Sequence, residues 1–336
     1  MNIQQNISLK PYNTFGMDVK ARYMAEYETV EELKTLFQTD ILKKNNFLHI
    51  GGGSNLLFLN DFEGVILHSQ IKSIEKVNEN DEFVWLRVGS GIVWDDFVAY
   101  CVENQWGGVE NLSLIPGEVG ASAVQNIGAY GVEVKDVIET VETIEIETLS
   151  HRIFNNAECK YDYRKSIFKT SLKGKYIVTH VTFRLRKQPD HQLDYQHLRA
   201  SVLQNGEITL ENIRNTVIAI RESKLPDPKI IGNAGSFFMN PIISKEQFQA
   251  LQAAYPTLPH YTVSETEEKI PAGWLIDQCG FKGKQVGNVG VHKNQALVIV
   301  NFGGGTGKEV ANLASLIQQK VKSTFGIDVV PEVNYI

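Results

Sequence analysis

Three segments carry side chains that could take part in acid–base or anion-binding chemistry. Ser236 follows a glycine and precedes two aromatic residues, so its hydroxyl could be presented to a ligand as a proton donor. Arg164 lies in a run with two tyrosines and a lysine, where its guanidinium could hold a carboxylate through two hydrogen bonds. Glu332 lies in an otherwise apolar tail, where burial would favour its neutral form. A turn serine, a solvated basic surface and an exposed carboxylate also fit these patterns.

A glycine-rich segment near the N-terminus could bind a diphosphate. It follows an apolar run and comprises Gly51, Gly52, Gly53, Ser54 and Asn55. Glycine permits a sharp turn there and lets successive backbone N–H groups face an anion. The dinucleotide fingerprint G-x-G-x-x-G is absent, because Leu56 stands where its last glycine would be. A tight turn without a ligand fits this segment as well.

A second segment is long, nearly uncharged and rich in small residues and amides. Its candidate ligand contacts are Ile115, Pro116, Gly117, Gly120, Ala121, Ser122, Gln125, Asn126, Gly128, Ala129 and Tyr130. Such residues let the backbone approach a flat ligand, while the side chains of Gln125 and Asn126 can supply directed hydrogen bonds. Two glycine segments from separate regions favour a ligand with both a diphosphate and a ring system, such as a flavin dinucleotide.

Other motifs predict structural roles. The run 303–307 precedes Lys308, but a phosphate-binding Walker loop would need glycine at Phe302 and serine or threonine at Glu309, so we expect a turn that leads into a helix. The hydrolase nucleophile turn G-x-S-x-G would need glycine at Ala234 and Phe238, so the sequence around Ser236 does not match it. The histidines are scattered without metal-binding spacing, so no catalytic metal is expected. The three widely spaced cysteines are expected to be reduced and structural; they are Cys101, Cys159 and Cys279.

Composition excludes several classes of protein. Lys and Arg total 33 against 39 Asp and Glu, and this net charge of −6 argues against a dedicated nucleic-acid binder. Apolar runs are much shorter than the roughly 20 residues of a membrane-spanning helix, and the N-terminus lacks a secretory signal. We therefore expect a cytoplasmic protein with no membrane partner.

The pattern of apolar residues predicts mixed helix and strand in three regions. Residues 1–70, joined by the tail 326–336, contain a helix that begins after Thr29 and apolar strands at 47–50 and 65–67. Residues 71–205 are rich in strands, with clear examples at 83–88 and 181–185. Residues 206–325 begin with a helix around 213–220 and end with one that starts at Thr306 and stops at Gly326.

Together these motifs resemble the UDP-N-acetylenolpyruvoylglucosamine reductase family, the flavoenzymes that complete UDP-N-acetylmuramic acid in bacterial peptidoglycan synthesis. The resemblance runs in collinear order from about residue 8 to the C-terminus, and the tyrosines near 163 and 195 resemble the branch with an extra loop over the substrate. The segments that carry it are 51–55, 115–131, 163–169, 223–228, 232–240, 272–277 and 331–333.

The resemblance implies a three-domain α+β flavoprotein. The regions 1–70 and 71–205 would hold FAD noncovalently in a fold similar to the vanillyl-alcohol-oxidase (PCMH-type) group, and 206–325 would form an α/β domain that binds substrate. NADPH would reduce the flavin and leave, and the enolpyruvyl sugar nucleotide would then take its place in a protein that acts as a monomer.

The resemblance also assigns roles to single residues. Ser236 would deliver a proton to the reduced substrate, and Arg164 and Glu332 would brace its carboxylate. The residues that would contact the sugar or the diphosphate are Tyr163, Tyr195, Lys224 and Asn240. Met239 departs from the pattern, because relatives often carry a basic residue there.

Two other functions fit part of the sequence. An FAD-dependent sugar oxidase of the same fold would use both glycine segments but leaves the combination of Ser236, Arg164 and Glu332 unexplained. A flavin-free nucleotide-sugar binding protein would lack the absorbance of a flavin.

Overall fold

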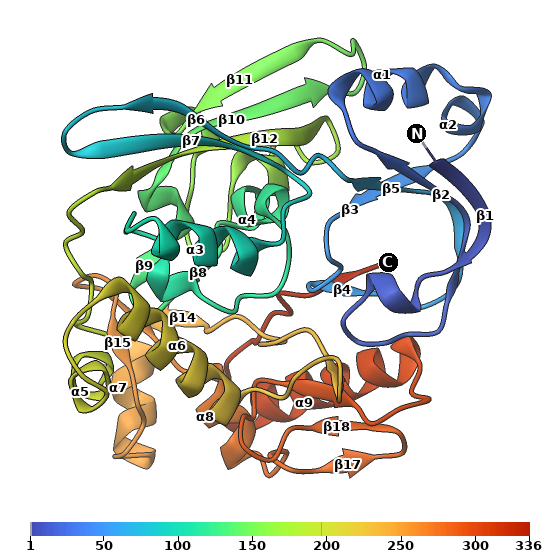
Figure 1. The fold of residues 1–336 in the computed structure, drawn as a ribbon. Helices are drawn as coiled ribbons and strands as arrows, with labels where there is room; N and C mark the ends of the chain where they lie inside the picture. The colour runs from blue at the N-terminus through green and yellow to red at the C-terminus, as the bar shows by residue number, and fades with distance from the viewer. Residues whose placement is uncertain (1, 196) are drawn as a thin grey trace. The chain divides into compact units, whose positions relative to one another are not determined.

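The computed structural model describes residues 2–195 and 197–336 (Figure 1). These residues form two compact units. The first unit contains the residues up to Ile7, Ala21–Gly52 and Glu63–Arg221, and the second contains Ser8–Lys20, Gly53–Phe62 and Glu222–Ile336. Each unit is therefore assembled from segments that are distant in the sequence.

The first unit begins with a four-stranded sheet of order β1-β2-β5-β3, in which β3 and β5 are parallel. Its elements are β1 (Asn2–Ser8), β2 (Lys20–Tyr27), β3 (Phe47–Ile50), β5 (Phe62–Ser69), α1 (Val30–Gln38) and α2 (Asp40–Lys44). The side chain of Thr29 accepts a hydrogen bond from the backbone of Glu32 and caps α1. Leu33 and Leu36 of α1 pack with Val65 and Leu67 of β5. The predicted strands 47–50 and 65–67 and the helix after Thr29 are confirmed.

A five-stranded antiparallel sheet forms the centre of the first unit, in the order β11-β10-β12-β7-β6. Its strands are β6 (Ile74–Glu79), β7 (Phe83–Gly89), β10 (Ile138–Glu145), β11 (His151–Asn155) and β12 (Tyr176–Arg186). Helices α3 (Trp94–Glu103) and α4 (Val119–Gln125) lie on one face of this sheet (Figure 1). Trp94, Phe97 and Phe183 are fully buried between them, which explains the alternating pattern that predicted β7 and β12.

Shorter elements complete the first unit. A hairpin joins β8 to β9, and the helices α5 and α6 pack on each other through Leu198, Val202, Ile213 and Val217. The bounds are β8 (Gly128–Ala129), β9 (Val132–Glu133), α5 (Leu198–Gln204), α6 (Leu210–Lys224), and the 3-10 turns η2 (Glu110–Leu112), η3 (Val134–Asp136), η4 (Ala157–Cys159) and η5 (Ile167–Lys169).

The second unit combines small sheets with three helices around one apolar core. Its sheets have the orders β13-β19-β18-β17 and β14-β16-β15, and β20 pairs with β4 in parallel. The bounds are η1 (Lys10–Tyr12), β4 (Leu56–Leu57), β13 (Gly232–Asn233), β14 (Ile242–Ser244), α7 (Lys245–Ala254), β15 (Tyr261–Thr262), β16 (Glu267–Lys269), α8 (Ala272–Gln278), β17 (Gln285–Val286), β18 (Val289–Val291), β19 (Ile299–Asn301), α9 (Gly307–Phe325) and β20 (Asn334–Tyr335).

Helix α9 begins and ends at the predicted residues. The hydroxyl of Thr306 accepts from the backbone of Glu309, whose carboxylate accepts in return from the backbone of Thr306. Gly326 ends the helix with a left-handed backbone at φ 70°. The glycines before the helix bond to the side chain of Asn301, so this glycine run is the expected turn that leads into a helix.

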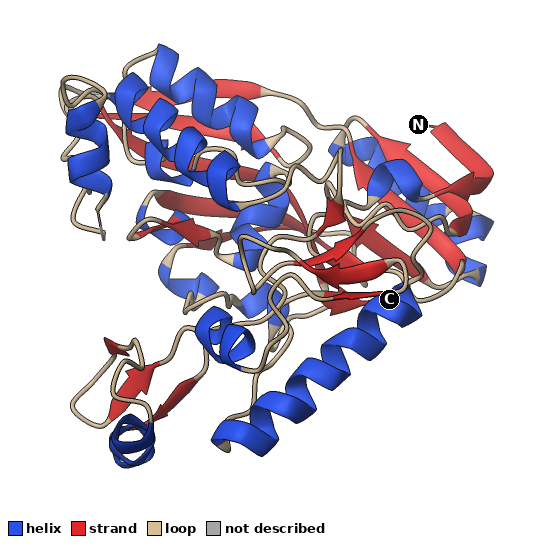
Figure 2. Cartoon of the chain, turned by 90° about the horizontal axis from the view of Figure 1, so that it is seen from below, coloured by secondary structure: helices blue, strands red, loops and turns tan. Residues whose placement is uncertain are grey.

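Helices and strands occur in both units, which agrees with the predicted α+β class (Figure 2). The cysteines are free, with Cys101 and Cys159 buried. Among the described residues, no helix combines the length and apolar character needed to cross a bilayer, and no group of side chains has the makeup of a metal site. The division into three domains by ligand role stays a prediction.

The cap of α9 allows a test of local stability. Thr306→Ala should lower the free energy of unfolding by about 1 kcal/mol, because it removes the acceptor for an N–H group at the helix start. Denaturant unfolding followed by circular dichroism would measure the change. Ser323→Ala, at an exposed position of the same helix, is the control. Equal midpoints for the two variants would contradict the prediction.

Candidate active site

The two predicted glycine segments lie against each other in the first unit. A Cβ atom built on Gly51 would be 3.2 Å from the Glu118 carboxylate and 3.3 Å from the Ala121 Cβ. A Cβ atom on Gly52 would be 3.4 Å from the Cα of Gly117. A side chain at residue 51 would therefore press on Glu118 and Ala121, whereas a Cβ at residue 52 would make ordinary contact with the Gly117 backbone.

The second segment is clamped to the end of β7. The N–H of Gly120 donates to the carbonyl of Ser90, and a Cβ on Gly120 would lie only 2.7 Å from the Ser90 Cβ. The N–H of Trp94 donates to the carbonyl of Gly117 on the other side. These bonds hold the loop on the central sheet. Ile115 packs its side chain against the core, and Pro116 at the loop start is exposed.

The first segment continues into the second unit at Gly53. Gly53 has φ 62°, and a Cβ there would collide with the backbone of Tyr12. Ser54 follows it and is partly buried. The side chain of Asn55 donates to the carbonyl of Glu332, and the carbonyl of Asn55 accepts from the N–H of Asn334. Asn55 thus joins this loop to the C-terminal tail.

Two predicted ligand-binding amides bond to protein groups. The Asn126 side chain is fully buried, donates to the Glu133 carboxylate and the Asp162 carbonyl, and accepts from the N–H of Lys135. The Gln125 carbonyl oxygen accepts from the Lys169 ammonium at 2.6 Å. These bonds hold the chain that leads to Arg164, and the expected side-chain bonds from Gln125 and Asn126 to a ligand stay a prediction.

The side chain of Ser122, another predicted ligand contact, also bonds to a protein group. Its hydroxyl is buried and donates to the Val119 carbonyl within α4. The predicted ligand contacts of this segment stay a prediction.

The side chain of Arg164 contacts the hairpin formed by β8 and β9. Its Nη2 donates to the Gly128 carbonyl at 2.6 Å, and its guanidinium is 5.2 Å from the Tyr163 ring. A Cβ on Gly128 would lie 2.9 Å from the Arg164 Nη1. The structure therefore brings the predicted catalytic arginine together with Gly128 and Ala129, which were predicted to bind the cofactor.

Tyr195 also lies over this hairpin. Its ring meets the Tyr130 ring edge-on at 6.0 Å, and its Cβ would be 3.4 Å from a Cβ on Gly131. The Tyr130 backbone is held by the side chain of Asn111. Tyr195, a predicted substrate contact, and Tyr130, a predicted cofactor contact, are thus neighbours.

Arg221 near the end of α6 is a further candidate that the sequence analysis missed. Its side chain is largely buried, and burial lowers the pKa of this guanidinium. Its Nε has no hydrogen-bond partner among the described residues. Burial raises the pKa of Tyr130, and the positive charge of Arg221 opposes this rise. A helical arginine with this spacing looks like any surface residue of an amphipathic helix, so the sequence offered no signal.

In the second unit the structure places Ser236 and Glu332 on paired segments. The N–H of Glu332 donates to the Phe237 carbonyl at 2.8 Å, and Phe238 forms an antiparallel bridge with Pro331. Phe237 and Phe238 are buried, whereas Ser236 is exposed. The aromatic pair anchors this segment, and Ser236 directly precedes the residue whose carbonyl bonds to Glu332.

The remaining predicted substrate residues also belong to the second unit. The carbonyl oxygen of Asn240 accepts from the N–H of Ala272 at the start of α8, so its amino group keeps its donors for a ligand. Lys224 is exposed at the end of α6. Met239 is partly buried.

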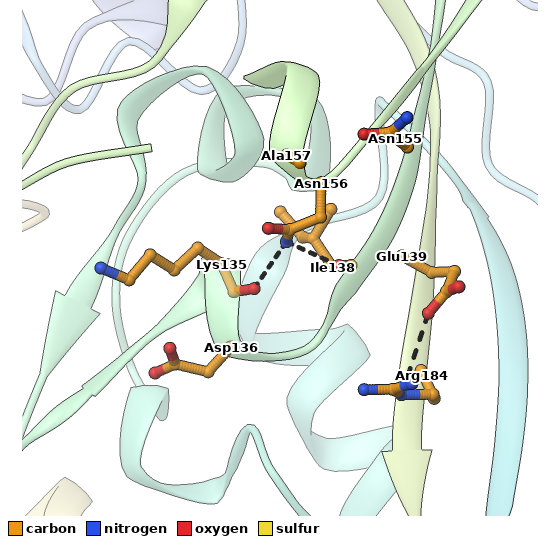
Figure 3. Close-up of a pocket in the computed structure, with 8 residues that line it drawn as sticks. All are labelled: Lys135, Asp136, Ile138, Glu139, Asn155, Asn156, Ala157 and Arg184. Carbon is orange, nitrogen blue, oxygen red and sulfur yellow. Dashed lines mark hydrogen bonds and ion pairs between the residues drawn. The ribbon is translucent and has the colours of Figure 1, made fainter. Parts of the chain in front are cut away.

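A separate hollow in the first unit has its own polar partners (Figure 3). The amide of Asn156 donates to the carbonyls of Lys135 and Ile138, and Arg184 pairs with Glu139 at 3.8 Å. These contacts already satisfy much of the polar lining, and the glycine loops do not contribute to it. The lining residues are Lys135, Asp136, Ile138, Glu139, Asn155, Asn156, Ala157 and Arg184.

Comparison with known proteins gives consistent matches over the whole chain. Residues 21–147 match the model of an FAD binding domain, and residues 227–336 match that of the UDP-N-acetylenolpyruvoylglucosamine reductase C-terminal domain. The chain is 54% identical over 334 residues to the UDP-N-acetylenolpyruvoylglucosamine reductase of Bacteroides fragilis, covering 99% of this chain and 100% of the relative. It is 48% identical over 340 residues to that of Flavobacterium johnsoniae, covering 100% of both.

Solved structures agree on the fold. The crystal structure of UDP-N-acetylenolpyruvylglucosamine reductase from Thermus caldophilus is similar with a TM-score of 0.70 at 23% identity, covering 100% of this chain and 99% of the other. A solvent-stable cholesterol oxidase is similar with a TM-score of 0.51 at 10% identity, covering 98% and 86%. The predicted mixed α+β flavoprotein fold is confirmed.

The residues present fit an FAD. The matched FAD binding domain includes both the Gly51–Gly52 backbone and the loop around Gly117, which lie against each other. Glycine-rich backbone of this kind suits a diphosphate, and the small residues that follow suit a flat ring.

The contact between Gly128 and Arg164 can be tested directly. Gly128→Ala should displace the guanidinium and break its bond to the residue 128 carbonyl, because the flexible end of Arg164 can move more easily than the backbone on the other side of the hairpin. A crystal structure of the variant would measure this. An Arg164 side chain in its original place would contradict the prediction.

Proposed function

The chain belongs to the UDP-N-acetylenolpyruvoylglucosamine reductase family, and from this premise we infer its reaction and the roles of its residues. It is an oxidoreductase that reduces UDP-N-acetylenolpyruvoylglucosamine to UDP-N-acetylmuramate with NADPH in peptidoglycan synthesis. FAD, when bound, supplies the two-electron carrier between NADPH and the enolpyruvyl double bond. The observation that carries the assignment of roles is the pairing of the Ser236 strand with the Glu332 segment.

We propose that backbone groups hold the FAD without a covalent bond. The contacting segments Gly51–Gly52 and Gly117–Ala121 would meet the diphosphate, and Gly128–Tyr130 would lie along the ring system. Gly53 and Asn55 would support the turn and connect it to the tail that carries Glu332.

Ser236 supplies the proton in this proposal. Reduction adds two hydrogens to the double bond, and one of them must arrive as a proton at the carbon next to the carboxylate. Ser236 is exposed, follows a glycine with φ 65° and is anchored by two buried aromatic residues. An exposed hydroxyl on a fixed strand can be held at one orientation to the substrate, which a proton donor requires.

Arg164 and Glu332 hold the substrate carboxylate. As negative charge spreads onto this group, the guanidinium stabilises it by charge-assisted hydrogen bonds, and a protonated Glu332 donates a further one. The bond from Arg164 to the Gly128 carbonyl fixes the position of the guanidinium. The proposal that the three residues act together rests on the family resemblance and on the geometry within each unit.

The other contacts bind the nucleotide sugar. Tyr163 and Tyr195 would cover the sugar, Lys224 would meet the diphosphate as a point charge, and Asn240 would donate its free N–H groups. The substrate partner is thus a small molecule. We further propose that the protein acts as a cytoplasmic monomer, that NADPH is preferred over NADH, and that 1–70 with 326–336, 71–205 and 206–325 divide cofactor and substrate binding as the sequence predicts.

An anaerobic experiment tests the reaction. NADPH should bleach the flavin absorbance of the purified protein, and the enolpyruvyl sugar nucleotide should then restore it. Absorbance spectra follow both steps. Recovery with oxygen alone would support the sugar oxidase instead, and a colourless protein would support the flavin-free binding protein.

A serine variant tests the proton donor. Ser236→Ala should leave flavin reduction by NADPH unchanged and slow reduction of the sugar nucleotide by about 10²-fold, the scale expected for a positioned acid. Stopped-flow absorbance separates the two half-reactions. Ser264→Ala, which removes an exposed hydroxyl of the same unit, is the control. Equal losses in both half-reactions would count against this role.

A further inference from the structure

A buried histidine lies between two carboxylates beneath the glycine loops. The His68 Nε2 is 2.8 Å from the Glu118 carboxylate, and its Nδ1 is 3.1 Å from that of Glu26. The exposed fraction of the His68 side chain is 10%, and that of Glu118 is also 10%. His68 comes from β5, Glu26 from β2 and Glu118 from the residue before α4, so they connect the four-stranded sheet of the first unit to the second loop.

Glu118 is also the point where the two loops meet. It lies between Gly117 and Gly120, and its carboxylate is the nearest atom to a Cβ built on Gly51. Its backbone forms a bridge with Val93. The carboxylate that His68 holds is therefore part of the contact that sets the spacing of the loops.

Both protonation states of His68 have partners. In the neutral state, Nε2–H can donate to Glu118 while Nδ1 accepts from the amide of Gln70, whose nitrogen is 3.0 Å away. In the cationic state, Nδ1–H can donate to Glu26 instead. A proton can thus be gained or lost without breaking the contact between His68 and Glu118.

The charges favour the cation. Burial alone would lower the pKa of His68, but the hydrogen bonds and charges of Glu118 and Glu26 outweigh it and raise the pKa above its ordinary value. The other titratable neighbours are Tyr27 on β2 and His49 on β3, which bond to each other at 2.7 Å. Burial lowers the pKa of His49 to about 4 and raises that of Tyr27, so both are neutral near pH 7.

A diphosphate bound at these loops would add negative charge close to the buried carboxylate of Glu118 and the partly buried carboxylate of Glu26. Charges at such short range repel strongly in a partly buried site unless a cation compensates them. His68 is the cation in contact with both carboxylates.

We infer that His68 is a positioning residue for the cofactor, whose protonated ring holds Glu118 at the contact between the two glycine loops and offsets the charge beneath the FAD diphosphate. This rests on the proposed assignment of the loops to FAD. It assigns a role in cofactor retention to residues that do not themselves take part in the reduction.

The inference predicts a pH-dependent affinity for FAD. Below the pKa of His68 in the flavin-free protein the cation is present in both states, so Kd is lowest. As the pH rises through that pKa toward the higher value of the complex, binding must take up a proton and Kd increases, by about tenfold for each unit between the two pKa values. Above both values Kd is constant again.

The experiment measures FAD release from the full-length holoenzyme on dilution, by flavin fluorescence, between pH 5.5 and 9. His68→Gln keeps an amide near Glu118 but cannot carry the charge. The Kd of this variant for FAD should therefore be about tenfold higher than that of the unmodified protein at low pH, and it should not change with pH. His180→Gln is the matched control, because His180 is also buried and lies 3.8 Å from a carboxylate, that of Glu142. It should behave as the unmodified protein does.

A second variant separates charge from packing. Glu118→Gln retains a hydrogen-bond acceptor for His68 but removes the charge that raises its pKa, so the midpoint of the pH dependence should move to lower pH. It also provides the test if His68→Gln does not fold. An unchanged pH profile in either folded variant would overturn the inference. An unmodified protein that binds no FAD at any pH would defeat the proposed function itself.

Discussion

The close contact between two stretches of backbone is the constraint on which the cofactor site depends. Gly51 and Gly52 meet Gly117 and Ala121 at distances that leave space only for a hydrogen or a methyl group. Such contact is possible because glycine places no side chain between the two loops. The spacing requires rigid support, and the bond from Gly120 to Ser90 supplies it by fixing the second loop on the central sheet.

Around this contact, polar side chains serve mainly to position other groups. Asn126 and Gln125 bond to the segment 162–169, and that segment presents Arg164 to the β8 hairpin. In the second unit, the buried side chains of Phe237 and Phe238 hold the segment that carries Ser236. The residues assigned to the reaction are few, and neighbouring groups hold Arg164 and Ser236 in place: the Gly128 carbonyl for Arg164 and the buried phenylalanines for Ser236. This arrangement agrees with the general need of a catalytic site for fixed geometry.

Local features were predictable from the sequence, and distant pairings were not. Thr306, Glu309 and Gly326 determine the ends of α9 through contacts within a few residues, so the helix could be placed correctly. The side chain of Gln125, by contrast, meets Lys169, which is 44 positions away, and nothing near it in the sequence indicates that its oxygen is already occupied. Likewise, nothing around His68 in the sequence is distinctive, and although Glu118 lies in a predicted cofactor loop, the sequence does not indicate that it pairs with His68. Their significance comes from sheet pairing that brings three separate segments together.

The discontinuous second unit has a consequence for how such proteins can be recombined. Phe15, Met17 and Leu57 are buried in the same core as Phe237 and the apolar face of α9, and the side chain of Asn301 bonds to the backbone of Phe15. A cassette cut at residue 227 would leave this core with an open apolar surface. Chimeras between family members should therefore inherit 8–20 and 53–62 from the same parent as the C-terminal half.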